Sequence, residues 1–179
     1  PLVRPYDYDE LGRMTAVRNS AGTALAQYTF DSRSRRTGLD YANGAYVDYS
    51  YDTASRLKSL DNQTNSGQYK YSYTYDDVGN RMTMVVTDSS GARTHVYGYD
   101  DIYQLTGVDY PTGYDYLATD TTVNYDAAGN RTTVVDGGGT TSYSSNDLNQ
   151  YSSVGQTNYT YDDNGNMTQD ELQRYSYDP

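Results

Sequence analysis

The sequence predicts an all-β fold built from tandem β-hairpins. Three observations predict it: a Tyr-Asp signature recurs along the chain, the residues beside each copy alternate between two classes, and clusters of Gly, Asn, Asp and Ser separate the alternating segments. A period of two residues sends successive side chains to opposite faces of a sheet. The separating residues are those that favour turns. Short strands with regularly placed turns are therefore expected over residues 1–179.

The composition supports strands over helices and predicts a thin core. Tyrosine supplies 24 of the 179 residues, and only 35% of the residues are hydrophobic. A tyrosine hydroxyl must stay in water or find a hydrogen-bond partner. Thr, Ser, Asn, Asp and Gly are abundant, whereas Ile102 is the single isoleucine and Phe30 the single phenylalanine. This composition is typical of strands interrupted by frequent turns.

The repeated signature is Tyr-Asp-x-x-Gly, followed by Arg or by Asn and Arg. Strong copies start at Tyr8, Tyr51, Tyr75, Tyr125 and Tyr161. Weaker copies start at Phe30, Tyr99 and Ser145, and a truncated one at Tyr177-Asp178. We take the following as structural signature residues: Tyr8, Asp9, Gly12, Arg13, Tyr51, Asp52, Arg56, Tyr75, Asp76, Gly79, Tyr99, Asp100, Tyr125, Asp126, Gly129, Tyr161, Asp162 and Gly165.

The spacing of the copies predicts one array of about eight repeats over residues 1–179, starting near residues 8, 30, 51, 75, 99, 125, 145 and 161. The steps between these starts vary, which favours loops of variable length on a constant scaffold.

Each repeat is expected to contain two strands. The segment Tyr69–Tyr75 places four tyrosines on one face and Lys70, Ser72 and Thr74 on the other. Similar Tyr-x-Tyr endings occur at residues 49–51, 97–99, 159–161 and 175–177. A second short strand follows the signature, as at residues 82–86, 105–108 and 132–135.

Two kinds of turn join these strands. Hairpin turns are predicted at residues 19–22, 43–44, 88–91, 111–113 and 136–139, which are rich in Gly, Asn, Asp and Ser. The signature forms the second kind, a tighter corner. Its Asp can accept a hydrogen bond from the backbone two residues later, and Gly12, Gly79, Gly129 and Gly165 can adopt a positive φ at low cost.

The signature residues resemble the YD repeats of the RHS family, and the resemblance covers essentially the whole chain. This family includes bacterial RHS toxins, insecticidal toxin-complex components, bacterial wall-associated proteins and the animal teneurins. The resemblance implies that successive hairpins join edge to edge into a continuous curved β-strip. In the family such a strip spirals into a hollow, barrel-like shell.

Some positions depart from the family pattern. Ser145-Asn146 replaces both signature residues, Tyr103 replaces the Gly of its repeat, and Arg36 stands where Leu or Met is usual. We expect irregular strand pairing at these places. The carboxyl-terminal core of the family is not visible in the sequence, and Asp178-Pro179 is interpreted as the start of another repeat. The chain begins at Pro1 rather than Met, so we expect an internal fragment of a longer protein.

Net charge and cysteine content narrow the classes of partner. The formal net charge is −11, which disfavours nucleic acid and anionic membranes. The absence of cysteine excludes a disulfide framework and thiolate chemistry. No apolar run approaches the length needed to span a bilayer.

The sequence predicts no enzyme, no cofactor and no metal centre. His95 is the only histidine and has no nucleophile beside it in the sequence, so a structural role is expected. The acidic segments 76–77, 100–101 and 162–166 contain oxygen ligands that could suit calcium, but they coincide with turns and lack EF-hand spacing. Gly137-Gly138-Gly139 precedes no Gly-Lys-Ser/Thr and is interpreted as a hairpin tip.

Three features leave alternatives open. The tyrosine faces could form an architectural ladder of cross-strand tyrosine pairs or a platform for sugar rings. The signature arginines are expected to pair with a carboxylate or carbonyl of a neighbouring repeat, which would set the register; these are Arg13, Arg35, Arg56, Arg81 and Arg131. Four Asn-x-Thr sequons occur, at Asn62, Asn130, Asn158 and Asn166, and chance alone can explain them in this composition.

The resemblance therefore implies a structural segment of a secreted or cell-surface protein, part of a shell that encloses or carries an effector polypeptide. The alternative is an extracellular fibre or adhesin that associates with identical copies through open β-edges and that could bind surface glycans. Flanking repeats of the same protein are the other expected partners.

Overall fold

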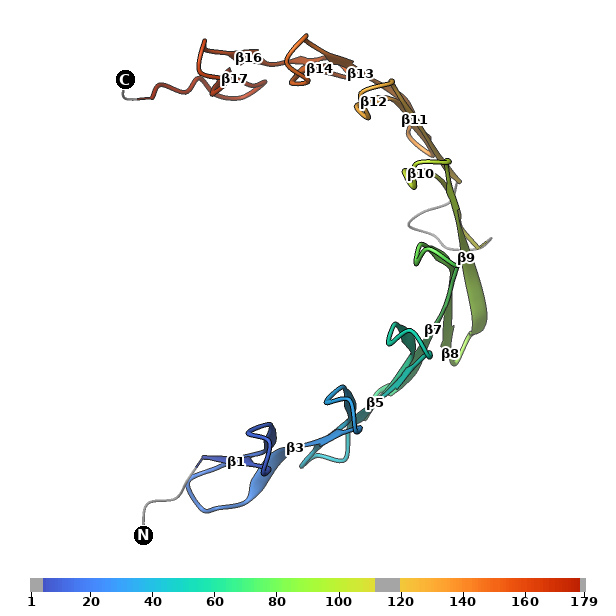
Figure 1. The fold of residues 1–179 in the computed structure, drawn as a ribbon, viewed down its shortest axis with the longest axis vertical. Coiled ribbons are helices and arrows are strands. Elements are labelled where there is room, and N and C mark those ends of the chain that lie inside the picture. The colour runs from blue at the N-terminus through green and yellow to red at the C-terminus, as the bar shows by residue number, and fades with distance from the viewer. Residues whose placement is uncertain (1–4, 112–119, 178–179) are drawn as a thin grey trace. The chain divides into compact units, whose positions relative to one another are not determined.

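The fold is all-β in the computed structural model, which describes residues 5–111 and 120–177 (Figure 1). Within these residues the chain forms 17 strands and no helix. Consecutive strands pair antiparallel, so the chain folds back on itself at every turn. The prediction of an all-β fold of tandem hairpins is confirmed.

The chain divides into two compact units, Pro1–His95 and Val96–Pro179. In the first unit the strands lie side by side in chain order: β1 (Tyr6–Tyr8), β2 (Met14–Arg18), β3 (Ala24–Phe30), β4 (Arg36–Tyr41), β5 (Tyr46–Tyr51), β6 (Leu57–Thr64), β7 (Gly67–Tyr75), β8 (Arg81–Asp88) and the start of β9 (Gly91–Tyr99).

The second unit continues with the end of β9 and follows the same order: β10 (Leu105–Asp109), β11 (Thr121–Tyr125), β12 (Arg131–Asp136), β13 (Gly139–Ser145), β14 (Tyr151–Val154) and β15 (Thr157–Asn158). A separate pair follows, β16 (Thr160–Tyr161) with β17 (Met167–Gln169).

One face of the sheet in the first unit is aromatic and aliphatic, and we call it the tyrosine face. On β7, Tyr71 lies directly opposite Leu60 of β6 and Val86 of β8. The next tyrosine on the same face, Tyr73, lies opposite Met84. A ring beside an aliphatic side chain is a favourable cross-strand pair. No Cα pair of the described strands joins two tyrosines, so directly opposed tyrosines do not build the cross-strand ladder that was one of the two alternatives.

The opposite face carries short hydroxyl side chains, and we call it the hydroxyl face. The hydroxyl oxygens of Ser50 and Ser59 are 2.6 Å apart, and so are those of Thr74 and Thr83. Each pair lies one residue before a signature tyrosine and joins the two strands of its hairpin. Thr29 and Thr37 repeat the hydroxyl contact in the first unit, and Thr160 and Thr168 repeat it in the second, where the Asn124 amide also donates to the Thr133 hydroxyl at 2.8 Å.

The core is thin because a single layer has no second layer to pack against. The described apolar side chains that are buried are Ala16, Ala26, Leu39, Val86, Tyr97, Val108 and Val123, and none of the described side chains is below 2% exposure. Most tyrosines are half-buried, which keeps their hydroxyl groups within reach of water or a partner.

Each of the eight signature positions forms a tight hairpin turn, which we call a YD corner. A YD corner comprises five residues, numbered here from its Asp or Asn: Asp9–Arg13, Asp31–Arg35, Asp52–Arg56, Asp76–Asn80, Asp100–Gln104, Asp126–Asn130, Asn146–Gln150 and Asp162–Asn166. In Figure 1 the corners of the first unit stand out from the same side of its sheet.

All eight corners have the same strand register. The residue before each corner pairs with the residue after it, and a register shift accompanies this pair; the pairs are Tyr8 with Met14, Phe30 with Arg36, Tyr51 with Leu57, Tyr75 with Arg81, Tyr99 with Leu105, Tyr125 with Arg131, Ser145 with Tyr151 and Tyr161 with Met167. The expected irregular pairing occurs beside Arg36, Tyr103 and Ser145-Asn146, but the same register shift accompanies every other corner, so it does not arise from these departures from the family pattern. A bulge is part of every corner.

The opposite ends of the hairpins are closed by the expected turns at residues 19–22, 42–45, 89–90 and 137–138. The predicted turn at residues 111–113 extends outside the described residues. Strand length accounts for much of the variation in repeat spacing: β7 and β9 have 9 residues, whereas β15 and β16 have 2. The prediction that loops alone vary is wrong in this respect.

Candidate functional site

The first and fifth residues of a YD corner close a hairpin loop of three residues. In the corner Asp52–Arg56, the backbone N–H of Asp52 donates to the carbonyl of Arg56 at 2.9 Å, and the N–H of Ser55 donates to the carbonyl of Asp52 at 3.0 Å. This pattern describes a type I turn followed by one residue in the left-handed region. The corresponding two bonds occur in all eight corners.

The carboxylate at the first position holds the loop together. Asp52 Oδ1 accepts the backbone N–H of Arg56 at 2.9 Å, and Oδ2 accepts the Nε–H of the same arginine at 2.7 Å. The side-chain hydrogen bond from Arg56, followed by the backbone one, lowers the pKa of Asp52 from its ordinary value. A charge-assisted bond of this kind is stronger than a neutral one.

Asparagine replaces arginine at the fifth position in three corners. Asn130 Nδ2 donates to Asp126 Oδ2 at 3.0 Å, and Asn166 Nδ2 donates to Asp162 Oδ2 at 2.9 Å. The side-chain bond from asparagine is the main cause that lowers the pKa of Asp126 and of Asp162. Asn80 and Asp76 repeat the contact at 2.8 Å.

The fourth position of every corner has a positive φ. Gly12, Gly79, Gly129 and Gly165 have φ values of 75°, 104°, 86° and 83°. The other four corners adopt the same conformation without glycine, at Ser34, Ser55, Tyr103 and Asn149, with φ between 58° and 67°. The sequence analysis did not identify these four. Their offset from the signature aspartate was the signal that could have found them.

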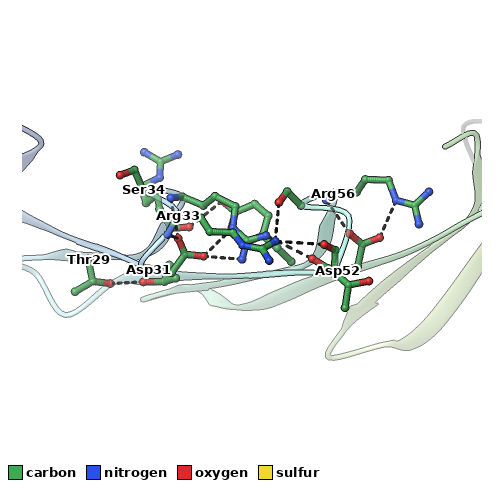
Figure 2. Close-up of polar contacts among 12 residues, drawn as sticks. Thr29, Asp31, Arg33, Ser34, Asp52 and Arg56 are labelled. Atoms are coloured by element: carbon green, nitrogen blue, oxygen red, sulfur yellow. Dashed lines mark hydrogen bonds and ion pairs between the residues drawn. The ribbon is translucent and has the colours of Figure 1, made fainter.

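In the three corners that end in arginine, the fifth residue also reaches the next corner, about twenty residues later in the chain. Figure 2 shows the polar contacts between the corners at Asp31 and Asp52. Arg56 Nη1 donates to the carbonyl oxygen of Asp76 at 2.8 Å. Arg13 Nη1 donates to the carbonyl of Asp31 at 3.1 Å, and Arg35 Nη1 to that of Asp52 at 3.4 Å. Each of these arginines therefore joins its own carboxylate to the backbone of the following repeat.

The second unit has the same forward contact with amide side chains. Asn130 Nδ2 lies 3.0 Å from Asn149 Oδ1, and Gln150 Nε2 donates to the carbonyl of Gly165 at 3.1 Å. A side chain added at Gly129 would have its Cβ 2.9 Å from Gln104 Nε2. The fifth residue thus packs against the left-handed residue of the next corner.

The signature aromatic residue receives the arginine of the preceding corner. The guanidinium carbon of Arg13 lies 4.8 Å from the ring centroid of Phe30, that of Arg35 4.5 Å from Tyr51, and that of Arg56 4.6 Å from Tyr75. Cation–π contacts favour such stacking.

The hydroxyl of the signature tyrosine adds another contact between neighbouring corners. We call these arginine and tyrosine contacts together the joint. Tyr75 Oη donates to the carbonyl of Leu57 at 2.7 Å, and Tyr51 Oη to that of Arg36 at 2.8 Å. Tyr125 and Tyr161 make the same contact with Leu105 and Tyr151, both at 2.9 Å. Each acceptor is the residue that directly follows the preceding corner. Neighbouring repeats are therefore held by one set of contacts that the sequence repeats.

Two arginines grouped with the others in the sequence lie one position later. Arg81 and Arg131 follow the asparagine of their corners, so they start a strand instead of closing the loop. Arg81 lies over the ring of Tyr73, with its guanidinium carbon 6.0 Å from the centroid. These two arginines therefore differ in position from Arg13, Arg35 and Arg56, which close their corners.

The corner that lacks both signature residues compensates with its neighbours. Ser145 has no ring, but Tyr151, six residues later, turns its hydroxyl to accept the backbone N–H of Arg131 at 3.0 Å. Its ring lies 5.4 Å from that of Tyr143. Asn146 replaces the carboxylate and accepts the N–H of Gln150 at 3.0 Å. The geometry of the corner persists although its residues change.

The other candidate sites from the sequence are His95, the acidic segments and the glycine run at residues 137–139. His95 is buried in β9 with 6% exposure. Within residues 5–111 and 120–177, no three His, Cys, Asp or Glu side chains are grouped to hold a metal ion. Gly137–Gly139 closes the turn between β12 and β13. No helix in the described part of the chain meets the length and apolarity needed to cross a membrane.

The second unit contains an aromatic cavity of about 250 Å³. It is lined by Tyr151, Val154, Tyr159, Tyr161 and Met167. Its walls are rings and aliphatic groups, against which a flat, weakly polar ring can stack.

Comparison with known proteins identifies the fold. No protein-family profile matches the chain, and no curated protein sequence matches it. The solved TcdB2-TccC3-Cdc42 structure superimposes with a TM-score of 0.68 at 17% identity, over 96% of this chain and 11% of the other. TcdB2-TccC3 without its hypervariable C-terminal region gives a TM-score of 0.69 at 15% identity, with the same coverage.

The Tc holotoxin pore of Photorhabdus luminescens gives the same result, with a TM-score of 0.68, 17% identity, and coverage of 96% of this chain and 11% of the other. The chain thus spans about a ninth of the length of the chains it resembles. Identity at this level shows the fold alone. The chain has the β-sheet fold found in the TcdB2-TccC3 and Tc holotoxin structures.

Proposed function

We propose that this chain is a wall segment of an RHS-type shell, in a secreted or cell-surface protein whose shell encloses or carries an effector polypeptide. In this role residues 1–179 act as one array of about eight YD repeats and perform no catalysis themselves. The observation that carries the proposal is the repeated joint between corners, in which Arg56 and Tyr75 link two hairpins. The fold likeness to the TcdB2-TccC3 structures supports the same role.

The joint suits a wall because further repeats can be added with the same contacts. The corners at Asp31 and Asp52 each offer an arginine forward and receive a tyrosine hydroxyl in return, so one repeat can follow another without a new kind of contact. A wall of this kind is one layer thick and needs little apolar core, as the seven buried apolar side chains of the described residues indicate.

Two measurements on the full-length protein test this proposal. Electron microscopy should show a closed, hollow particle, and limited proteolysis should leave an internal polypeptide intact until the shell is opened by denaturant. Particles that are solid or thread-like, or an effector region digested at the same rate as exposed loops, would contradict the proposal.

The exposure of Tyr8 supports flanking repeats or identical copies as partners. Tyr8 is 60% exposed, whereas Tyr51 and Tyr75 are half-buried beneath the arginine of a preceding corner. A hairpin that pairs with β1 and ends in a corner with arginine would cover the Tyr8 ring. If a preceding repeat of the same protein does this, the full-length protein stays monomeric in sedimentation velocity at high concentration.

The second candidate function, a self-associating fibre or adhesin, uses the same exposed edge. It requires that one copy supplies the hairpin that covers Tyr8 of the next, so filaments should lengthen with concentration and disappear when Tyr8 is replaced by Asp. The aromatic cavity at Tyr151 and Tyr161 would serve glycan binding in such an adhesin. A glycan array with no bound sugar would remove that part.

A further inference from the structure

The four Asn-x-Thr sequons differ in the hydrogen bonds and the exposure of their side chains. Attachment of an N-linked glycan requires an asparagine amide that can leave its hydrogen bonds and a threonine hydroxyl, two residues later, that the transferase can reach. The four sequons begin at Asn62, Asn130, Asn158 and Asn166. Their surroundings differ in both respects.

In two sequons the asparagine amide is held by hydrogen bonds within a YD corner. Asn130 Nδ2 donates to Asp126 Oδ2 at 3.0 Å and to Asn149 Oδ1 at 3.0 Å. Asn166 Nδ2 donates to Asp162 Oδ2 at 2.9 Å. Both side chains are half-buried. A glycan on either nitrogen would break the bond to the carboxylate that shapes the corner.

In the sequon at Asn62, the sheet partly buries the asparagine and a turn holds the threonine hydroxyl. Asn62 lies on β6 between Val47 of β5 and Tyr69 of β7, and it is half-buried on the tyrosine face. The Thr64 hydroxyl donates to the carbonyl of Gly67 at 3.0 Å and accepts the N–H of Ser66 at 3.1 Å. The transferase would have to displace both contacts.

The sequon at Asn158 is the accessible one. It is the last residue of β15, its side chain is exposed, and within residues 5–111 and 120–177 its amide has no hydrogen-bond partner. Its neighbours in register, Ser153 and then Ser144, carry short hydroxyl side chains, so the amide lies among small polar groups. Thr160 is also exposed and shares one contact, with the Thr168 hydroxyl at 2.8 Å.

We propose that Asn158 is the acceptor site for an N-linked glycan on the folded chain, and that the other three sequons are protected. The co-substrate is an oligosaccharide linked to a lipid pyrophosphate. Asn158 Nδ2 forms a bond to the sugar C1, the bond from C1 to the pyrophosphate oxygen breaks, the lipid pyrophosphate leaves, and the amide proton passes to a base of the transferase. No electron transfer is involved.

The test incubates the folded chain with a purified oligosaccharyltransferase and its lipid-linked oligosaccharide, followed by peptide mapping. Synthetic peptides that span each sequon serve as the unfolded reference. Asn158 should be modified at a rate close to that of its peptide. Asn130 and Asn166 should be slower than their peptides by about tenfold or more, because a hydrogen bond to a charged group is worth at least that factor.

Two variants test whether the hydrogen bonds of the asparagine amide decide which sequon is modified. Asn158→Gln should abolish most of the modification, and Asp126→Ala, which removes a partner of the Asn130 amide, should raise modification at Asn130. Asp77→Ala, at the exposed second position of another corner, is the matched control and should leave the pattern unchanged. Modification of Asn130 or Asn166 at peptide-like rates in the unchanged chain, or an Asn158 that is modified only in its peptide, would overturn the proposal.

Discussion

Arg56 and Asp76 are 20 residues apart in the chain, yet Arg56 Nη1 donates a hydrogen bond to the Asp76 carbonyl oxygen at 2.8 Å. The same guanidinium binds the carboxylate of Asp52 through Nε and stacks on Tyr75. One side chain therefore shapes its own corner and places the next. This double role explains why a long planar cation suits the fifth position of the corner.

Replacing Arg56 with Asn should separate these two roles. Asn can bond the Asp52 carboxylate, as Asn80 does for Asp76, but it is too short to stack on Tyr75. We expect a loss of about 1 to 2 kcal/mol in the free energy of unfolding, from one hydrogen bond and one cation–π contact. Urea denaturation measures it, with Lys58→Asn as a surface control. Equal effects of the two substitutions would contradict the proposed joint.

Glycine should be favoured over other residues at the left-handed position of the corner. Ser55 adopts a φ of 67°, which costs an L-residue about 1 to 2 kcal/mol. Ser55→Gly should therefore stabilise the chain, by less than that amount because glycine loses more backbone entropy on folding. Gly12→Ala, at a φ of 75° with open space around it, should destabilise the chain. Thermal unfolding of both variants checks the sign, and two shifts in the same direction would count against this account.

The hydroxyl of Tyr75 should contribute separately from its ring. Tyr75→Phe keeps the ring under Arg56 and removes the bond to the Leu57 carbonyl, which should cost about 0.5 to 1.5 kcal/mol. Tyr69→Phe is the matched control on the same strand, because the Tyr69 side chain is exposed (42%) and its hydroxyl has no hydrogen-bond partner among the described residues. That change should stay within about 0.5 kcal/mol. A control as destabilised as the test variant would refute the assignment.

Burial predicts where aliphatic side chains matter. Leu39 is 7% exposed, and Leu39→Ala should cost about 2 to 5 kcal/mol. Leu11 is 73% exposed at a corner tip, so Leu11→Ala should be nearly neutral. Chemical denaturation of the two variants compares them directly, and a neutral Leu39→Ala would show that the thin core does not hold the first unit.

Acid should weaken the corners. The pKa of Asp52, Asp126 and Asp162 is lowered in the folded chain. A carboxyl with a lowered folded pKa stabilises the fold above its unfolded pKa, and this stabilisation is lost as the pH falls through the folded value. Stability should therefore decline below about pH 4. Thermal unfolding across this range measures the decline, and Asp52→Asn should reduce its steepness.

The sequence alone determined the class of fold and the places of the corners. Alternation about Tyr69–Tyr75 and the turn residues of the signature are local properties, since a two-residue period and a turn preference operate within a few neighbouring residues. For the same reason the positive φ of Gly12 and Gly79 could be predicted.

The tertiary structure decided which residues meet. The sequence shows Arg56 near Asp52, but its contact with Asp76 depends on which hairpins become neighbours and on the bulge that sets their register. The partners of the tyrosine rings, Leu60 and Val86 for Tyr71, were missed for the same reason. Register across strands arises from packing between distant segments, whereas the conformation of one turn arises from its own residues.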